Sequence, residues 1–583
     1  MKTKLLSLLF AMMLVIGMLA SCDPEEGGDG DEYDDVIIPA GAPTYNVTWD
    51  RTEIKYALTD SSSANELASG CKKYYSGTEV TGTSEKVDDL VSARNLAAAK
   101  SANVSVRFDY ETAAGGWGGN IDTIVTKTTT ASSQSPDIYA NFVYDITCAQ
   151  LRDCFANLLQ TGKANNFRFI QPDYNPTSSN YFDAKAGEGY FFEYMKSLSL
   201  SDDKMFVLAS NYCTDLVRSF LIVPMNVEQM STLVGTGDDN ENKSYTGDMQ
   251  QVSDFYDLVW RTEAKANVNA KYKEGFTYQV IAHYADKFYS QAESNDVLSG
   301  KVAFAIGATS GLPASGILYT TSVTVISKEA NGDGTYTYSY PTENPELKAF
   351  AANLADLFKE GRTGVLAVKT ADAGVSGVYA TELLAIRSNF AAGRVLFGGV
   401  VALGSLDEAD YQKMRVEGQK MGFGILPVPL YRAADESGKL EEYKTLVHNI
   451  AKVVAISKTT QNFTQCTAYL DYLSRMSQEI LDEYYEVKLT SAVGGMAEQF
   501  NVQMLTYIRN HVRNCFDKTF EDSVAKLMEA TDGTAATTAG KWHEVLSSNK
   551  FNYPELFNEY RSKAASKEAK LQEAVATWNG FQD

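Results

Sequence analysis

The run Ser84-Glu-Lys-Val-Asp-Asp-Leu-Val-Ser-Ala-Arg-Asn-Leu-Ala-Ala-Ala-Lys100 indicates a helix, and Val104-Ser-Val-Arg-Phe-Asp109 after it indicates a strand. The alternation then repeats, because Ile138–Val143 predicts a strand and Cys148–Leu159 predicts a helix with apolar residues on one face. A chain that keeps this order of elements is expected to form stacked α/β layers.

The same alternation continues along the chain. Further strands are expected at 204–209, 220–224, 302–306, 395–397 and 423–426, with a helix at 346–358. From 464 onward the pattern is mainly helical, for example at 464–477 and 499–512. The stretch Asn331–Tyr340 has a glycine-rich turn before alternating Tyr and Thr, which predicts a β-hairpin.

The N-terminus has the features of an export signal. Lys2 and Lys4 precede the apolar run Leu5–Ala20, whose 16 residues are too few for a comfortable membrane span. The run ends in Leu19-Ala20-Ser21-Cys22, which resembles a bacterial lipoprotein signal. That resemblance implies removal of residues 1–21 and lipidation of Cys22. The alternative is a plain secretory signal with an incidental cysteine.

An acidic tether is expected at 22–44. Residues 23–35 hold eight Asp and Glu, and the only apolar side chain among them is that of Tyr33. Such a segment cannot bury enough surface to fold, and its charges repel one another. It resembles surface-export signals of some Gram-negative lineages, and a solubilising linker is the other interpretation.

The charge and cysteine content exclude several classes of partner. The 583 residues include 52 Lys and Arg against 74 Asp and Glu, a net charge of −22, which disfavours nucleic acid and anionic membrane surfaces. Four His and seven Cys show no zinc-type spacing, so neither a metal nor a cofactor is expected. With Cys22 lipidated, six cysteines remain, and free buried thiols are expected in preference to disulfides.

Several segments, in order, resemble one family of proteins. The first are Glu85–Asn95, Ser135–Tyr139, Lys204–Asn211 continuing to Asn226, and Phe255–Trp260. The most specific are Gly393-Arg-Val-Leu-Phe397 and Gly422-Phe-Gly-Ile-Leu-Pro-Val-Pro429 with Tyr431, before Tyr484-Tyr485, Leu489 and Met504-Leu505. Together they resemble lipid-anchored extracellular solute-binding proteins of ABC transporters, of the family 1 type.

The resemblance implies an α/β, two-lobe periplasmic-binding-protein type II fold with a hinge and a helical C-terminal part. Lobe 1 is expected at 45–215, lobe 2 at 216–445, and the return to lobe 1 with the C-terminal helices at 446–583. Clefts between domains are the usual place for small ligands, and hinge closure lets a ligand bias two states. The expected monomer captures a sugar or oligosaccharide outside the cytoplasm and delivers it to an ABC permease, held to the membrane only by its lipid.

Two departures from the family weaken the assignment of a ligand. The Trp-Trp pair found in many members near 188–192 is absent, and Ser491–Gly495 replaces a longer acidic motif. Aromatic residues in the cleft often decide what such a protein binds.

Candidate ligand-binding residues are placed just after predicted strands: Tyr139, Asn141, Asn211, Tyr212, Gly398 and Gly399. A Tyr can stack on a sugar ring while polar neighbours bond its hydroxyls, and Gly lets the backbone approach a ligand. Each could instead be a core or turn residue. Trp117, in a glycine-rich loop, either grips ligand or packs on a lobe, whereas Trp260 is expected in the core.

No catalytic motif was found, so no enzyme activity is expected. The sequence has no Gly-x-Ser-x-Gly elbow, Walker loop or His-Glu-x-x-His motif, although a pair of glycosidase carboxylates stays open. Two alternatives to sugar transport remain. One is the same fold binding peptides or another nutrient, and the other is a surface glycan-binding lipoprotein of the starch-utilisation type, which is largely helical.

Overall fold

The computed structural model describes residues 33–60, 75–76, 86–112, 119–159, 189–233, 276–289, 300–307, 320–352, 365–368, 378–407, 423–430, 443–448, 451–484, 501–512 and 553–581, with short gaps inside some ranges. The chain divides into two compact units, Met1–Ile37 and Ile38–Asp583. All elements named below lie in the second unit.

The first sheet contains four of the described strands, in the order β12–β3–β1–β2. These are β1 (Thr52–Asp60), β2 (Val104–Thr112), β3 (Ile138–Phe142) and β12 (Lys452–Ile456). β1 runs parallel to β2 and β3, and β12 runs antiparallel to β3. The carboxyl ends of β1, β2 and β3 therefore lie at one edge of the sheet.

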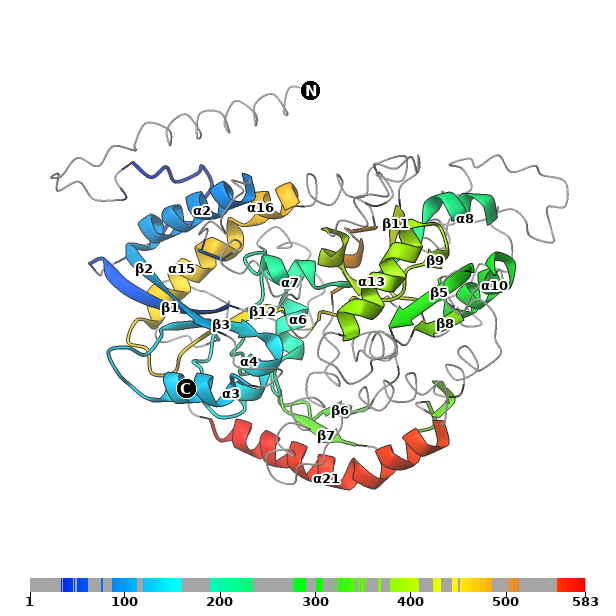
Figure 1. Ribbon diagram of the computed structural model, residues 1–583. Helices are drawn as coiled ribbons and strands as arrows, with labels where there is room; N and C mark the ends of the chain where they lie inside the picture. Colours follow the sequence, from blue (N-terminus) through cyan, green and yellow to red (C-terminus); the bar gives the residue numbers. More distant parts are fainter. Residues whose placement is uncertain are drawn as a thin grey trace. The chain divides into compact units, whose positions relative to one another are not determined.

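Helices cover both faces of this sheet (Figure 1). On one face lie α2 (Lys86–Ala102), α15 (Phe463–Arg475) and α16 (Gln478–Glu483), and on the other α3 (Ile121–Thr129) and α4 (Val143–Gln150). The shorter α6 (Phe192–Ser197) and α7 (Thr214–Arg218) follow in the chain. In β1, Ile54, Tyr56 and Leu58 are buried on one face and Ala57 and Thr59 on the other, as expected for a strand covered by helices on both sides.

The second sheet has the order β10–β4–β9–β5–β8, with β11 also paired to β4. Its strands are β4 (Leu221–Asn226), β5 (Val302–Gly307), β8 (Val365–Val368), β9 (Val395–Phe397), β10 (Val401–Ala402) and β11 (Phe423–Leu426). β5 is parallel to β8 and β9, whereas β4 is antiparallel to its neighbours. Packed with it are α8 (Val227–Leu233), α10 (Tyr278–Phe288) and α13 (Val378–Ala391), and the 3₁₀ helix η4 (Leu403–Asp407) follows β10.

In the described part of the chain, two segments lead from one sheet to the other. The first passes through α7 into β4, and the second runs from 443 to 451 into β12. They pair with each other, because Leu221 N donates to Leu446 O (2.9 Å) and His448 N donates to Ser219 O (3.0 Å). Two α/β lobes joined by paired crossing segments confirm the expected fold class, while the domain boundaries stay a prediction.

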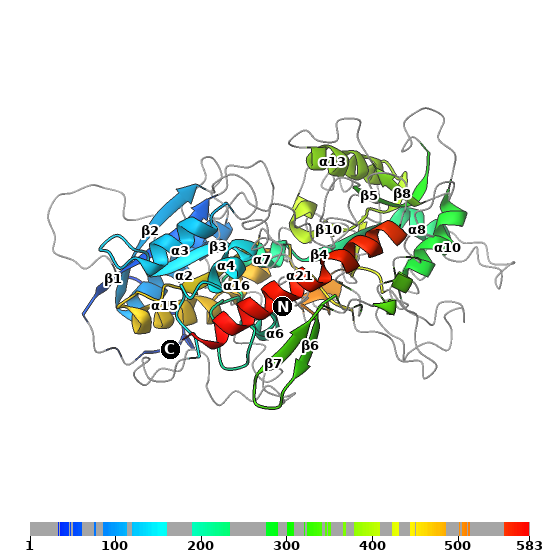
Figure 2. The same ribbon diagram turned by 90° about the horizontal axis from the view of Figure 1, so that it is seen from below.

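Two further elements complete the chain. β6 (Ser327–Ala330) and β7 (Tyr336–Ser339) pair antiparallel, which confirms the predicted hairpin. The helix α21 (Tyr553–Asn579) lies beside this hairpin (Figure 2). Among the described residues, no helix combines the length and apolar character needed to cross a membrane.

One predicted helix is wrong, and one predicted strand is reduced. The helix expected at Cys148–Leu159 is replaced by α4, which begins at Val143 and ends before Leu151. Asp153 then has a φ of +53°, and Phe155 forms a β-bridge with Ser457, so a distant pairing replaces the local helix signal. The stretch 204–209 forms only an isolated bridge, from Leu208 to Val454.

Four of the remaining cysteines are confirmed as free and buried, namely Cys148, Cys154, Cys213 and Cys466. Cys71 and Cys515 lie outside the described residues. Burial raises the pKa of the Cys154 and Cys213 thiols to about 12, because a thiolate loses its hydration there.

Candidate functional site

A row of polar side chains lies at the carboxyl edge of the first sheet. Thr59 in β1 is paired with Glu111 in β2, and Val453 in β12 is paired with Asn141 in β3. Continuing the register of β1 and β3 by one residue places Asn141 beside Thr59. Paired residues in neighbouring strands point to the same face, so Thr59, Glu111 and Asn141 share one side of the sheet.

Two members of this row keep buried polar atoms unpaired. Asn141 is 1% exposed, and its Oδ1 accepts a hydrogen bond from Phe142 N at 2.7 Å. The Nδ2 of Asn141 and the Oγ1 of Thr59 have no hydrogen-bond partner within the described part of the chain. An unmade buried hydrogen bond costs about 1–3 kcal/mol, so these atoms are suited to receive a polar ligand group.

Glu111 is held from both sides by its neighbours. Tyr139 Oη donates a hydrogen bond to Glu111 Oε2, and Lys127 Nζ of α3 donates to Glu111 Oε1. Burial raises the pKa of Tyr139 well above its ordinary value, and the negative charge of Glu111 adds to the effect. Tyr139 thus stays protonated and orients the carboxylate at the strand edge.

A second carboxylate follows β3 directly. Asp145 lies in the first turn of α4, where the backbone N–H groups favour a negative charge. It is fully buried, and its Oδ2 accepts a hydrogen bond from Asn120 Nδ2 at 2.8 Å. Its charge also adds to the raised pKa of Tyr139. The strand edge therefore combines carboxylate, amide and hydroxyl groups.

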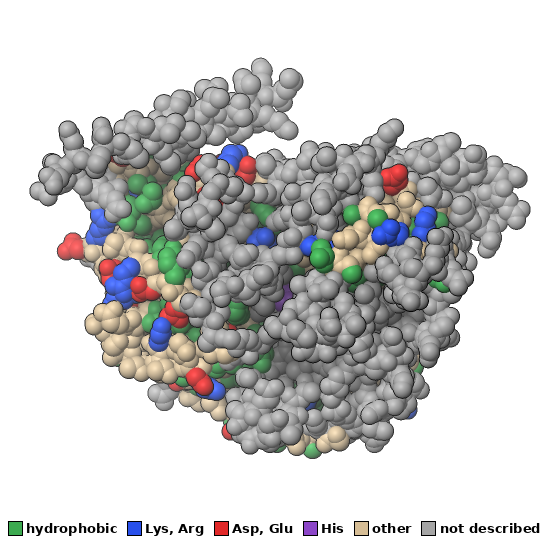
Figure 3. Space-filling model, in the orientation of Figure 1, with side chains coloured by type: hydrophobic (Ala, Val, Ile, Leu, Met, Phe, Trp, Pro, Cys, Tyr) green, Lys and Arg blue, Asp and Glu red, His purple; other side chains and the backbone are tan. Residues whose placement is uncertain are grey.

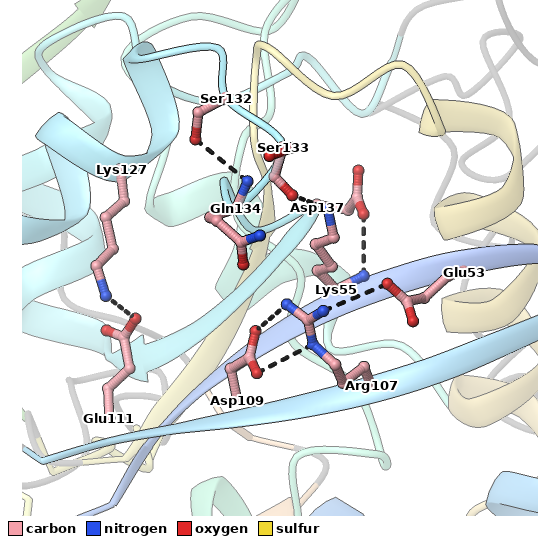
Figure 4. Close-up of polar contacts among 10 residues, drawn as sticks. All are labelled: Glu53, Lys55, Arg107, Asp109, Glu111, Lys127, Ser132, Ser133, Gln134 and Asp137. Atoms are coloured by element: carbon pink, nitrogen blue, oxygen red, sulfur yellow. Dashed lines mark hydrogen bonds and ion pairs between the residues drawn. The ribbon is translucent and has the colours of Figure 1, made fainter.

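An exposed ladder of charges continues from this row along β1 and β2 (Figure 4). Arg107 donates to both oxygens of Asp109, at 3.1 and 2.9 Å, and to Glu53 Oε1 at 3.5 Å. Lys55 Nζ donates to Ser133 O nearby. In the space-filling view, charged side chains of both signs lie intermingled on this part of the surface (Figure 3). Mixed charge of this kind does not form an anion-binding patch.

Of the predicted ligand-binding residues that the structure describes, only Tyr139 and Asn141 lie at this edge of the first sheet. Tyr212 lies on the opposite face of the sheet, fully buried, with its hydroxyl donating to Tyr56 Oη at 3.0 Å. The Arg94 guanidinium carbon lies 4.8 Å from the centroid of the Tyr212 ring. In the free protein Tyr212 is thus a core residue, and its part in ligand binding stays a prediction.

Asn211 has its side-chain atoms occupied by protein partners. Its Nδ2 donates to Gln478 Oε1 at 3.0 Å, and its Oδ1 accepts from Arg509 Nη2 at 2.9 Å. These bonds join the start of the first crossing segment to α16 and to the residues after 501. These bonds give Asn211 a structural role, and its role in ligand binding stays a prediction.

Gly398 and Gly399 lie between β9 and β10 in the second sheet. A Cβ at Gly398 would approach Pro224 Cγ to 2.9 Å and Phe390 Cδ2 to 3.2 Å. Gly399 has a φ of +76°, which favours glycine. Close backbone packing and a turn therefore explain both glycines, and ligand contact stays a prediction for them.

Trp117 and Trp260 lie outside the described residues. Sequence reasoning missed Thr59, Glu111 and Asp145. Their positions in the sequence could have identified them. Thr59 and Glu111 are polar residues near the carboxyl ends of strands, and Asp145 follows a strand at the start of a helix. Within the described ranges, no group of three or more His, Cys, Asp or Glu side chains is placed to hold a metal ion.

No protein-family model and no curated protein matches the chain. Solved structures similar to it include the sugar-binding protein MalE from Xanthomonas citri, with 10% identity, a TM-score of 0.48, and coverage of 90% of this chain and 99% of that one. Another is the galacto-N-biose-/lacto-N-biose I-binding protein of the ABC transporter from Bifidobacterium longum, with 10% identity, a TM-score of 0.47, and coverage of 91% and 98%. A third is the ABC substrate-binding protein Lmo0181 from Listeria monocytogenes, with 11% identity, a TM-score of 0.45, and coverage of 89% and 100%. Similarity of this degree does not by itself assign a fold or a ligand to the chain.

Proposed function

We propose that this protein is an extracytoplasmic solute-binding protein that captures a sugar or oligosaccharide and delivers it to an ABC permease. The observation that carries the proposal is the row of Thr59, Glu111 and Asn141 at the carboxyl edge of a parallel sheet, with buried polar atoms left unpaired. Ligands of α/β sheets bind outside the carboxyl ends of their strands.

The chemistry of the row fits a ligand rich in hydroxyl groups. A sugar hydroxyl both donates and accepts, so it can accept from Asn141 Nδ2 and donate to Glu111 in the same site. Glu111 already has Lys127 as a partner, so the row does not require a cationic ligand. A peptide ammonium could also meet a carboxylate here, and the ligand panel below separates the two classes.

The two-lobe architecture supports capture rather than catalysis. Two described segments lead from one sheet to the other, and they pair through Leu221 with Leu446 and through His448 with Ser219. Lobes joined in this way can close on a ligand, and a closed, occupied state is what a permease could recognise. The two sheets also disfavour the starch-utilisation type of glycan-binding protein, which is largely helical.

The N-terminal features support the place of action. The apolar run Leu5–Ala20 followed by Cys22 and an acidic stretch suits an exported chain anchored through a lipid on Cys22. Metabolic labelling of the full chain with an alkyne fatty acid, compared with Cys22→Ser, tests the anchor. Labelling that persists in C22S would overturn it.

A thermal-shift screen of the mature protein tests the ligand. Mono- and oligosaccharides, amino acids and short peptides are compared, since a ligand at 100 times its Kd adds about 2.7 kcal/mol of stability. A shift with one class of sugar supports the proposal, and a shift with peptides alone contradicts it. Release of smaller sugars from an oligosaccharide during prolonged incubation would indicate an enzyme instead.

One variant ties the ligand to the row. Asn141→Leu removes the unpaired amide at similar volume and is expected to weaken binding about tenfold or more, because one buried hydrogen bond to the ligand is lost. Asn157→Leu is the matched control, since Asn157 is a buried amide whose Oδ1 accepts from Leu159 N and Met205 N and whose Nδ2 donates to Asp203 O. Calorimetric titration of both variants should show an unchanged Kd in N157L. Equal weakening of binding in both variants would show that the ligand does not bind at the row.

A further inference from the structure

A further segment of the chain bonds the second sheet. The described residues of 501–509 are helical, and residues 501–512 are called the bridging segment below. Ile425 N of β11 donates a hydrogen bond to Asn501 Oδ1 at 2.9 Å, and Asn501 Nδ2 donates to Phe423 O of β11 at 3.0 Å. Asn501 is 1% exposed, so both bonds are shielded from water. The start of the bridging segment is therefore fixed to the second lobe.

The end of the bridging segment bonds the second crossing segment. Thr445 Oγ1 donates to Ile508 O at 2.7 Å, and Thr445 N donates to His511 O at 2.9 Å. Thr445 also forms a β-bridge with Val512. The bridging segment is thus attached at both ends, and it is expected to move with β11 and this crossing segment when the lobes move.

One side chain of the bridging segment reaches the first lobe. Arg509 Nη2 donates to Asn211 Oδ1 at 2.9 Å and to Gln478 Oε1 at 3.2 Å. Asn211 Nδ2 donates to the same Gln478 Oε1 at 3.0 Å. Three hydrogen bonds therefore link the three side chains in a ring, with Arg509 as the member from outside the first lobe.

The two acceptors of Arg509 are held in place by the first lobe. Asn211 is 1% exposed, and its backbone N donates to Gly189 O at 2.6 Å. Gly189 has a φ of +86°, and a Cβ there would clash with Ser474 O of α15, so this close packing requires glycine. Gln478 begins α16, which packs against α2. The acceptors for Arg509 thus belong to the packed body of the first lobe.

We propose that Arg509, Asn211 and Gln478 form a latch that holds the two lobes in the arrangement of the structure. Both acceptors are uncharged amide oxygens, so the latch is weaker than a pair of arginine and carboxylate and can open when the lobes move. The inference rests on the proposed function and deepens it, because the population of the binding-competent arrangement sets the apparent affinity for ligand. It assigns Asn211 a role in lobe movement instead of direct contact with the ligand.

Distances between two spin labels in the mature chain, without any ligand, test the latch. Non-natural amino acids carry the labels at Asp122 of α3, whose side chain is 88% exposed, and at Leu384 of α13, which is 47% exposed. Arg509→Met keeps an unbranched apolar stem and removes both bonds to the first lobe. The share of distances outside the wild-type peak is expected to rise about tenfold, because bonds from a charged donor are lost. A distribution identical to that of the wild type would overturn the proposal.

Arg394→Met is the matched control for the distance measurement. Arg394 Nε also donates to an amide oxygen, Asn389 Oδ1 at 2.6 Å, but both residues lie in the second lobe. Its distance distribution should equal that of the wild type. Broadening in R394M as large as in R509M would contradict the latch, since any lost arginine bond would then have the same effect.

Gln478→Glu tests the latch in the opposite direction and keeps Arg509. It gives the guanidinium a charged acceptor and retains the bond from Asn211 Nδ2, so amide exchange in residues 501–512 should become slower than in the wild type. The bond lost is the one from Gln478 Nε2 to the exposed Asp482. Exchange as fast as in the wild type, or faster, would contradict the latch. Neither measurement uses a ligand, so a failed ligand screen and a failed latch are told apart.

Discussion

Two buried polar clusters of the first lobe differ in how fully their atoms are paired. Beside the crossing segments, Asp215 Oδ1 accepts from Tyr75 Oη at 2.5 Å, while Oδ2 accepts from Lys452 N at 3.0 Å and lies 3.5 Å from Lys452 Nζ. At the carboxyl edge of the same sheet, Asn141 Nδ2 and Thr59 Oγ1 keep no partner within the described residues. We infer that the fully paired Asp215 cluster stabilises the fold, whereas the unpaired atoms of Asn141 and Thr59 can bond a ligand.

The largest expected effect comes from the Asp215 cluster. Asp215→Asn leaves the Lys452 ammonium, which is fully buried, without its counter-charge, so the free energy of unfolding should fall by about 3–5 kcal/mol. Urea denaturation followed by circular dichroism measures the change. In Asp215→Leu/Lys452→Met both charges are absent, and most of the lost stability should return. A D215N variant as stable as the wild type would show that the cluster contributes little.

A smaller effect separates two buried amides. Asn157→Leu breaks three hydrogen bonds and should cost about 1–3 kcal/mol, because the backbone groups it leaves are then unpaired. Asn141→Leu loses only the bond from Phe142 N and removes an unpaired donor, so its unfolding free energy should change by less than about 1 kcal/mol. Urea midpoints of the two variants, measured side by side, give the comparison. Equal losses would mean that Asn141 is as structural as Asn157.

The thiol of Cys213, next to the Asp215 cluster, can report how often the structure around the cluster opens. Burial raises the pKa of Cys213 to about 12, with the charge of Asp215 adding to the effect, so the native thiol is almost entirely protonated at pH 8. Alkylation of Cys213 should be undetectable in the native protein at pH 8 and rapid in urea, as peptide mapping can show. Because Cys213 is fully buried, reagent reaches it only when the structure opens, so native alkylation should stay far slower than alkylation in urea. Rapid native labelling at pH 8 would show that the cluster opens.

Features that depend on neighbouring residues in the sequence can be predicted from it, whereas features that depend on distant residues cannot. The strands at Val104 and Ile138 and the hairpin near Asn331 follow from local alternation, and all three are confirmed. The helix predicted at Cys148–Leu159 is wrong because Phe155 pairs with Ser457, about three hundred residues away. A local pattern carries no information on such a partner.

The candidate site shows the same limit. Asn141 could be chosen because it follows a predicted strand, whereas Thr59 and Glu111 join it only through the register of three strands. The same rule predicts Tyr212. In the structure Tyr212 lies on the other face of the sheet, where its hydroxyl bonds the buried Tyr56. Strand ends can be found from sequence, but the face on which a side chain lies depends on tertiary packing.

The smallest effect is expected on the exposed charge ladder beside the row. The side chains of Arg107 and Asp109 are 40% and 45% exposed, so water and salt already screen their attraction. Arg107→Gln should therefore leave the urea midpoint and the ligand Kd unchanged. Among the described strands, however, β2 lies at the edge of its sheet, and charges along such a strand discourage pairing with another chain. R107Q should thus aggregate faster at high concentration, as light scattering can follow. A changed Kd would place Arg107 within the binding site. An unchanged rate of aggregation would mean that Arg107 does not protect the edge of the sheet from pairing.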